Sequence, residues 1–174
     1  MPDPILFYST NQKTPLVTFP QALLKGIAPD GGLFMPEQIP VITPAEFEKY
    51  SDLPYHEIAF DVSRRFLAGQ IPDAELKRIV KESYNYPVPL EQVTGRKYIM
   101  RLDQGPTASF KDFAARMMGR LMQYYLQIGN RKLLILTATS GDTGSAVANA
   151  FYGLDNVQIV ILFPKAEVTA RQRK

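Results

Sequence analysis

The chain has 174 residues, of which 45% are hydrophobic and 21% are charged, and it carries a net charge of +3. This is the composition of an ordinary globular protein, with room for one domain or two small ones. The chain contains no cysteine and a single histidine, His56, which excludes disulfides, cysteine nucleophiles and any thiolate or histidine-rich metal site within one chain.

Prolines divide the chain into two unlike halves. Twelve of the fourteen prolines lie before residue 90. Because proline is excluded from central strands and interrupts helices, we expect irregular segments and short helices in the first half. Short strands are predicted at 6–8 and 16–19, paired as a hairpin around residues 11–13. A short helix at 21–25 should end at Gly26.

Three further helices are predicted in the first half. The sequence Thr43-Pro44-Ala45-Glu46 is a capping box with proline in the first helical position, so a helix should run from it to about Tyr50. Apolar residues at helical spacing predict the other two helices, at 55–67 and 72–84.

The second half has the pattern of a regular α/β domain. We place a domain boundary at Tyr86-Pro87-Val88-Pro89, which gives an irregular α+β domain at 1–88 and an α/β domain at 89–174. The elements predicted in the second domain are strands at 97–102, 131–138 and 157–163 and helices at 110–129 and 145–152. This β-α-β-α-β order is typical of a mostly parallel sheet with right-handed crossovers.

The predicted sheet stops after its third strand. The strand at 131–138 is apolar enough to be buried on both faces. A parallel sheet that ends at 163 would expose strand edges and apolar surface. We therefore expect the chain to associate with another polypeptide or with itself.

Lys111 lies at a position suited to covalent chemistry. The turn Gly105-Pro106 is followed by Ser109, a good N-cap residue, and by a run with helical spacing. The lysine would then stand at a helix N-terminus, where the macrodipole opposes its charge and should lower its pKa. An amine that is easily neutralised can form a Schiff base with an aldehyde cofactor. The alternative is an ordinary surface lysine in an ion pair.

A second candidate segment is the loop Thr139-Ser140-Gly141-Asp142-Thr143-Gly144-Ser145, between a predicted strand and a predicted helix. Such a loop directs backbone N–H groups and hydroxyls at an anion. In a parallel sheet the ends of successive strands come together, so we expect the loop to lie near Lys111. The alternative is a plain helix start with Asp142 or Thr143 as its N-cap.

Three separated stretches of the chain resemble the N-terminal part of the threonine synthases, fold-type II enzymes that use pyridoxal phosphate (PLP). The stretches are Tyr8-Ser9-Thr10 with Gly26–Pro36, then Gly105–Phe113, and then Thr139–Gly144. The chain departs from the family at Asn11, where an arginine is usual, and at Gln104, where many members have a histidine.

The resemblance implies the fold-type II scaffold and a role for each matching residue. The family converts O-phosphohomoserine and water to threonine and phosphate, and Lys111 would bind PLP and move protons at the substrate α-carbon. The other residues implied are Phe110 and Asp142 for the cofactor, and Thr107, Ser140, Gly141, Thr143 and Gly144 for the substrate. The cations available for the substrate phosphate are Lys13, Arg116 and Arg120. The segment Asp30-Gly31-Gly32 would be a structural turn with positive φ.

Two alternatives remain open. A related phospho-lyase on the same scaffold would release a keto acid, and a non-catalytic α/β module would bind partners only. Threonine synthases are much longer than 174 residues and carry the loop that grips the PLP phosphate in a second α/β domain. We therefore expect the chain alone to bind PLP weakly and to associate with that missing domain or with itself.

The sequence pattern argues against a membrane or a nucleic acid as a partner. No apolar run approaches the ~20 residues of a membrane span, and the N-terminus lacks the pattern of a signal peptide. Basic and acidic residues are mixed without interleaved aromatic residues, so we expect no nucleic-acid binding despite the basic end of the chain. Together with the lack of cysteine, this predicts a cytoplasmic enzyme.

Overall fold

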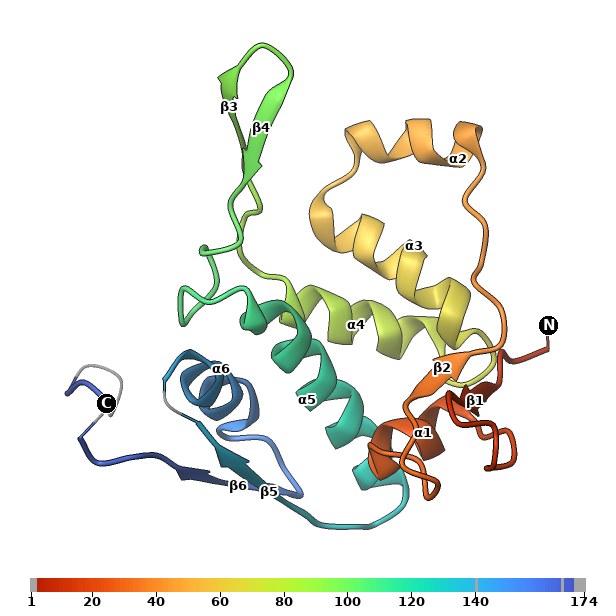
Figure 1. Ribbon diagram of the computed structural model, residues 1–174. Helices are drawn as coiled ribbons and strands as arrows, with labels where there is room; N and C mark the ends of the chain where they lie inside the picture. Colours follow the sequence, from red (N-terminus) through yellow and green to blue (C-terminus); the bar gives the residue numbers. More distant parts are fainter. Residues whose placement is uncertain (1–2, 140, 167, 171–174) are drawn as a thin grey trace. The chain divides into compact units, whose positions relative to one another are not determined.

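The computed structural model describes residues 3–139, 141–166 and 168–170 and confirms a mixed α/β fold (Figure 1). Contacts divide the chain into two units, Met1–Lys81 and Glu82–Lys174. The first unit contains β1 (Phe7–Ser9), α1 (Phe19–Lys25), β2 (Phe34–Pro36), α2 (Pro44–Glu48), the short 3-10 helix η1 (Lys49–Asp52), α3 (Tyr55–Leu67) and most of α4 (Asp73–Ser83). The second contains β3 (Leu90–Thr94), β4 (Lys97–Met100), α5 (Lys111–Ile128), β5 (Leu133–Ala138), α6 (Asp142–Phe151) and β6 (Val157–Leu162).

The small sheet of the first unit differs from the predicted hairpin. β1 pairs antiparallel with β2, with Tyr8 opposite Met35. The strand predicted at 16–19 is wrong, because only Val17 makes a bridge to β1 and Phe19 already begins α1. Pro20 explains the difference, since its fixed φ suits the first turn of a helix and it has no N–H for a strand.

The helices of the first unit lie where the sequence places them. α3 has the predicted ends, α4 is shorter by one residue at each end, and α1 ends at Gly26 as expected. The capping box is present, because the Thr43 N–H donates to the Glu46 carboxylate (2.8 Å) and the Glu46 N–H donates to the Thr43 hydroxyl (3.3 Å). α2 ends at Glu48, and the remainder of the predicted helix is the 3-10 turn η1.

In the second unit one parallel pair of strands packs against α6, and α6 packs against α5 (Figure 1). β5 and β6 are parallel, with Leu133 opposite Val157. The core is formed by Ala115, Ala150 and Phe151, with Met122 among the side chains packed around them. α6 ends before Gly153, whose φ of 74° is typical of the glycine that follows a helix.

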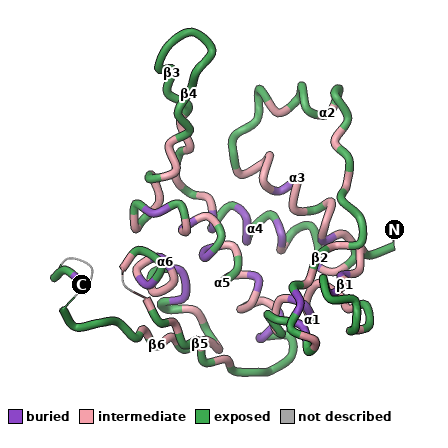
Figure 2. Tube along the Cα trace, viewed as in Figure 1, coloured by how far each residue is buried: buried purple, intermediate pink, exposed green. Residues whose placement is uncertain are grey.

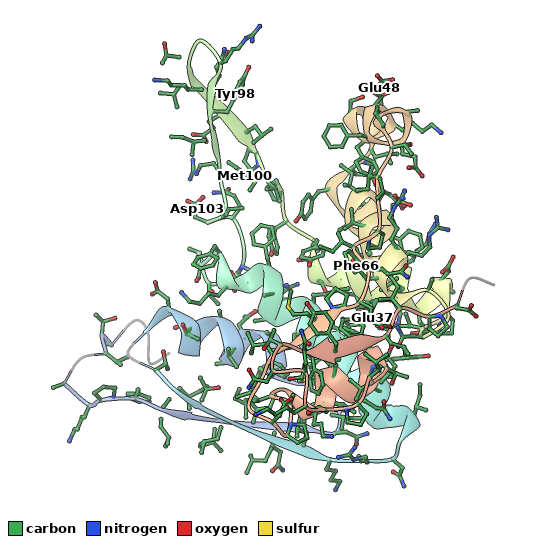
Figure 3. The ribbon with its side chains drawn as sticks, turned by 45° about the vertical axis from the view of Figure 1, so that its right-hand side comes forward. Glu37, Glu48, Phe66, Tyr98, Met100 and Asp103 are labelled. Carbon is green, nitrogen blue, oxygen red and sulfur yellow. The ribbon has the colours of Figure 1, made fainter. Side chains whose placement is uncertain are left out.

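The predicted strand at 97–102 is present as β4, but its partner is different. It pairs antiparallel with β3, a strand that the sequence did not predict, and not with β5 or β6. Every residue of the two strands is exposed (Figure 2), and side chains such as Tyr98 and Met100 stand out from the hairpin (Figure 3). Among the described residues the parallel sheet therefore has two strands, because Gly95, with a φ of 53°, turns the chain back into a local hairpin.

The prediction that β5 is buried on both faces is wrong. Burial alternates along both parallel strands, and Leu134 and Leu136 are 60% and 64% exposed. Val160 and Leu162 of β6 are exposed in the same way. α6 covers one face of the pair and no described element covers the other, so the expected apolar surface is present.

The contact division at Lys81/Glu82 falls inside α4. The boundary at 88/89 was predicted from a break in sequence pattern and stays a prediction. None of the described helices is both long and apolar enough to cross a bilayer.

Candidate functional site

Lys111 is the first residue of α5, at the helix mouth that the sequence predicts. The cap is displaced by one residue, because Phe110 and not Ser109 occupies the N-cap position. Ser109 still contributes, since its buried hydroxyl accepts the Lys111 N–H at 3.3 Å. The backbone N–H of Lys111, which has no partner within the helix, is satisfied in this way.

The loop before the lysine wraps around the carboxylate of Asp112. This side chain is fully buried and accepts both the Thr107 N–H (2.9 Å) and the Thr107 hydroxyl (2.7 Å). A Cβ at Gly105 would lie 2.4 Å from a carboxylate oxygen of Asp112, so only glycine fits there. Ala108 adopts a φ of 54°, which is unfavourable for a residue with a side chain. Thr107 thus shapes the turn, whatever else it contacts.

The lysine amine lies over an exposed aromatic ring. Lys111 Nζ is 4.7 Å from the centroid of Phe110, whose side chain is 62% exposed. Phe110 is therefore not part of the hydrophobic core. No carboxylate of the described residues lies within ion-pair distance of Lys111, so an ordinary ion pair has no support either. An available amine beside an open aromatic face is compatible with a planar aldehyde cofactor.

The loop before α6 is organised by Thr139, a residue of the predicted loop for which no role of its own was predicted. The hydroxyl of Thr139 accepts the N–H groups of Gly141 and Gly144, both at 3.1 Å. A Cβ at Gly144 would lie 2.2 Å from the Thr139 methyl group, so this glycine is required by the close approach. The sequence signal was a threonine at a strand end, two residues before a Gly-x-x-Gly segment.

This capping also shifts the start of α6. The helix begins at Asp142, three residues before the predicted start at Ser145. Its N-cap is Gly141, so the alternative with Asp142 or Thr143 as N-cap is wrong. Within the ranges that the structure describes, the N–H groups of Asp142 and Thr143 have no acceptor, and both residues are exposed. Ser140 lies outside the described residues.

α5 and α6 lie side by side and begin toward the same end of the second unit, where β5 ends (Figure 1). Gly119 permits this packing, because a Cβ there would lie 3.1 Å from the Ala150 carbonyl oxygen. We expected strand pairing to bring Lys111 and the glycine loop to one end, but β4 is not in the parallel sheet. Helix packing accounts for the common direction instead.

Two of the cations considered for a substrate phosphate, Arg116 and Arg120, already interact with other groups of the second unit. Buried Arg116 donates to the carbonyl oxygens of Glu82 and Ser83, both at 2.8 Å, and to the Asn85 side chain at 2.9 Å. Arg120 Nε lies 3.5 Å from the Glu82 carboxylate. Arg116 therefore satisfies the C-terminal carbonyls of α4, where a cation is favoured by the helix dipole. Lys13 belongs to the first unit and has an exposed side chain.

Asp30 has the structural role predicted for its segment. Its carboxylate accepts the Ser9 hydroxyl (2.6 Å) and the N–H groups of Gly32 and Lys13 (both 3.0 Å). These bonds, led by the one from Ser9, lower the pKa of Asp30 to about 2. Gly31 has a φ of 80°, and a Cβ at Gly32 would lie 2.1 Å from the Ser9 hydroxyl.

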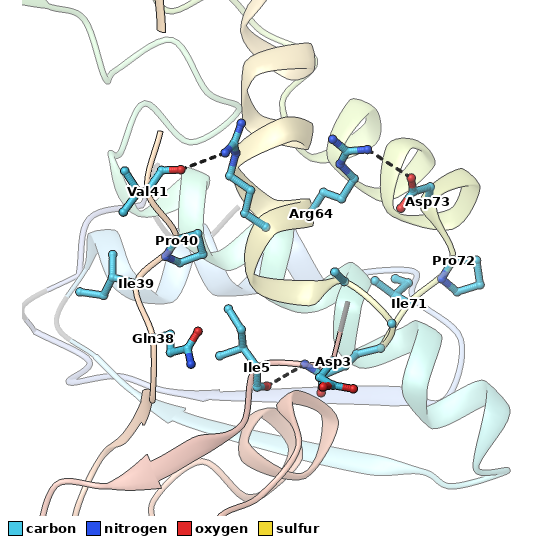
Figure 4. A pocket seen from close by; sticks show the side chains of 14 residues that line it. Asp3, Ile5, Gln38, Ile39, Pro40, Val41, Arg64, Ile71, Pro72 and Asp73 are labelled. Atoms are coloured by element: carbon cyan, nitrogen blue, oxygen red, sulfur yellow. Dashed lines mark hydrogen bonds and ion pairs between the residues drawn. The ribbon is translucent and has the colours of Figure 1, made fainter. Parts of the chain in front are cut away.

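The first unit also contains an open cavity of about 1170 Å³ (Figure 4). Its lining is apolar with charged residues on one side, including Ile39, Val41, Arg64 and Asp73. Arg64 and Asp73 pair with each other at 3.7 Å, so the cavity presents little net charge. His56 of the same unit is partly exposed, with Nε2 3.8 Å from the Glu57 carboxylate. Within the described residues no group of three metal-ligating side chains is found.

Comparison with known proteins gives one consistent family. Residues 6–84 match the family model described as threonine synthase N terminus. The chain is 42% identical over 173 residues to the threonine synthase of Pseudomonas aeruginosa, covering 97% of this chain and 37% of the relative. It is 37% identical to that of Saccharomyces cerevisiae, again covering 97% of this chain and 37% of the relative.

The solved structures agree with the sequence matches. The structure of PLP-bound threonine synthase from Brucella melitensis superposes with a TM-score of 0.92 at 38% identity, over 95% of this chain and 37% of that one. The yeast enzyme gives a TM-score of 0.89 at 35% identity, over 98% of this chain and 38% of that one. The chain thus spans little more than a third of the length of the relatives that it matches.

Proposed function

We propose that this chain is the N-terminal portion of a PLP-dependent threonine synthase. Its residues 6–84 match the family model of the threonine synthase N terminus. The protein would act as a lyase that converts O-phosphohomoserine and water to threonine and phosphate. The observation that carries the proposal is the Lys111 amine at the mouth of α5, over the exposed ring of Phe110.

The residues of this chain would divide the work. Bound PLP supplies the electron sink for bond changes at the substrate. Lys111 would hold the cofactor through its amine and, once released, move the proton at the substrate α-carbon. Phe110 would lie against the cofactor and Asp142 near its phenolic oxygen. Substrate binding would fall to the remaining predicted residues, Thr107, Ser140, Gly141, Thr143 and Gly144.

The start of α6 would receive the substrate carboxylate. This assignment is supported by the backbone N–H groups of Asp142 and Thr143, which have no acceptor among the described residues. An anion at this position is favoured by the helix dipole. The N–H groups of Gly141 and Gly144 already donate to Thr139, so they would contribute only if that hydroxyl moved.

The proposal extends to the protein as a whole. It includes the fold-type II scaffold, a domain boundary at 88/89, a cytoplasmic location, and association with a second α/β domain or with another copy. Its support is the likeness to PLP-bound threonine synthase and the uncovered face of β5 and β6. Because the chain spans little more than a third of its relatives, we expect it to bind PLP weakly by itself.

The test is a titration of the 174-residue chain with PLP, followed by the absorbance band of lysine-bound cofactor. We expect a saturable band in the wild-type chain and in Lys97→Ala, a variant of an exposed lysine on β4, and its loss in Lys111→Ala. An equal band in all three would mean that PLP reacts with surface amines in general, and the assignment of Lys111 would be wrong.

A further inference from the structure

The segment that leads into Lys111 is held by one buried carboxylate. Asp112 has no exposed surface, and its two oxygens bind the N–H and the hydroxyl of Thr107 at 2.9 and 2.7 Å. Hydrogen bonds to an ionised carboxylate are stronger than those between neutral groups. The loop is therefore tied to the first turn of α5 by a pair of strong bonds.

The same loop contains backbone that needs such a restraint. Ala108 adopts a φ of 54°, and a residue with a side chain persists in this conformation only where its surroundings hold it. Gly105 packs against the Asp112 side chain, with no room for a Cβ. Asp112 thus lies at the centre of the turn, with Gly105 and Thr107 against it.

The position of Asp112 in the helix decides where the lysine points. Consecutive helical residues are separated by about 100° around the axis. Because the Asp112 side chain is turned inward to the loop, Lys111 is directed elsewhere and reaches the ring of Phe110. Restraint of the loop and placement of the amine therefore depend on the same residue.

We infer that Asp112 is a positioning residue for Lys111. It clamps the loop 105–110 through Thr107 and so fixes the point at which α5 begins. The placement of a reacting amine rests on the function proposed above, whereas the clamp itself does not. Two measurements on the 174-residue chain separate these parts.

Hydrogen exchange tests the clamp without any cofactor. In Asp112→Asn the amide nitrogen cannot accept a hydrogen bond, so one of the two bonds from Thr107 is lost. We expect exchange in the segment 105–110 to become about tenfold faster, the effect of losing one bond to a charged group, with unchanged exchange in the middle of α5. Thr107→Ser keeps both donors and should exchange like the wild type. Unchanged exchange in Asp112→Asn would overturn the clamp.

Thr107→Val is the second variant, in case Asp112→Asn unfolds the chain. It removes only the hydroxyl bond and leaves the carboxylate and the Thr107 N–H in place. We expect faster exchange confined to the same loop. Wild-type exchange in this folded variant would equally overturn the clamp.

Trapping with borohydride tests the placement of the amine. The chain is incubated with PLP and reduced, and the share of label on Lys111 relative to Lys97 is read by peptide mass spectrometry. We expect this share to fall by about fivefold in Asp112→Asn and Thr107→Val and to be restored in Thr107→Ser. Selective labelling in the wild type with an equal share in the variants would refute the positioning role. No preference for Lys111 in the wild type would refute it together with the proposed function, while the exchange result would still decide the clamp.

Discussion

At the scale of single residues, Asp30 shows how one carboxylate organises a turn. It binds a hydroxyl and two backbone N–H groups of the first unit, and its pKa falls from 3.8 to about 2. A pKa lowered on folding means that the ionised form stabilises the fold. This stabilisation is present above pH 4 and is lost as the pH falls from about 4 through about 2.

We therefore predict a specific pH dependence for Asp30→Asn. The wild-type chain should be the more stable one at pH 7, and the difference should shrink between pH 4 and pH 2. The measurement is the urea midpoint at several pH values, followed by circular dichroism. Taking the difference between the two proteins removes the contribution of other carboxylates such as Glu46, whose pKa is also lowered to about 2. A difference that does not change with pH would contradict the assigned pKa.

At the scale of elements, a buried guanidinium ties α5 to the segment 82–85 of the same unit. Arg116 of α5 donates to the last carbonyls of α4 and to Asn85. We predict that Arg116→Met, which keeps an unbranched stem but removes the guanidinium, lowers the free energy of unfolding by about 2–4 kcal/mol because three bonds to a buried charge are lost. Arg131→Met, at an exposed arginine beyond the end of α5, is the matched control and should change stability by less than about 0.5 kcal/mol.

The start of α6 allows a prediction about two residues in contact. Gly144→Ala would place a Cβ 2.2 Å from the Thr139 methyl group, so we expect a loss of about 1–3 kcal/mol from overpacking. Thr139→Ser removes that methyl group and keeps the hydroxyl that caps the helix. The double variant should recover most of the loss, as measured by a double-mutant cycle in urea. If the two effects simply add, the close approach is not the cause.

The elements also show what a single sequence can reveal. The helices α3 and α4, expected at 55–67 and 72–84, and the capping box at Thr43 could be predicted because their signals are local, as could the helix mouth at Lys111. The roles of Thr139 and Asp112 could not be predicted. Each role depends on which backbone N–H groups the fold brings to the oxygen atoms of that side chain. The partner of β4 was missed for a similar reason, since a strand sequence does not identify its neighbour.

At the scale of the whole molecule, the main feature is the uncovered face of β5 and β6. An apolar strand can be buried on both faces or on one, and its composition alone does not distinguish the two cases. Here Leu134 and Leu136 are more than half exposed, because α6 is the one described element that packs on the pair. Apolar surface of this kind favours association.

We predict that the double variant Leu134→Glu, Leu136→Lys reduces self-association of the chain while leaving its thermal stability nearly unchanged. Both side chains are largely exposed, so little buried contact is lost. Sedimentation velocity over a range of concentrations is the measurement. Tyr152→Ser, at an 86% exposed residue outside the sheet, is the control and should behave like the wild type. Equal association in all three proteins would place the contact elsewhere.

The hairpin of β3 and β4 has a consequence for how the chain is cut. Its tip carries Arg96 and Lys97, which are both exposed. The two strands pair only with each other among the described elements. Exposed turns with few packed neighbours are the preferred places for proteases. Brief trypsin digestion should therefore nick the chain first at this tip, separating residues 1–96 from the rest. Lys111 and its Asp112 clamp would remain together on the second fragment.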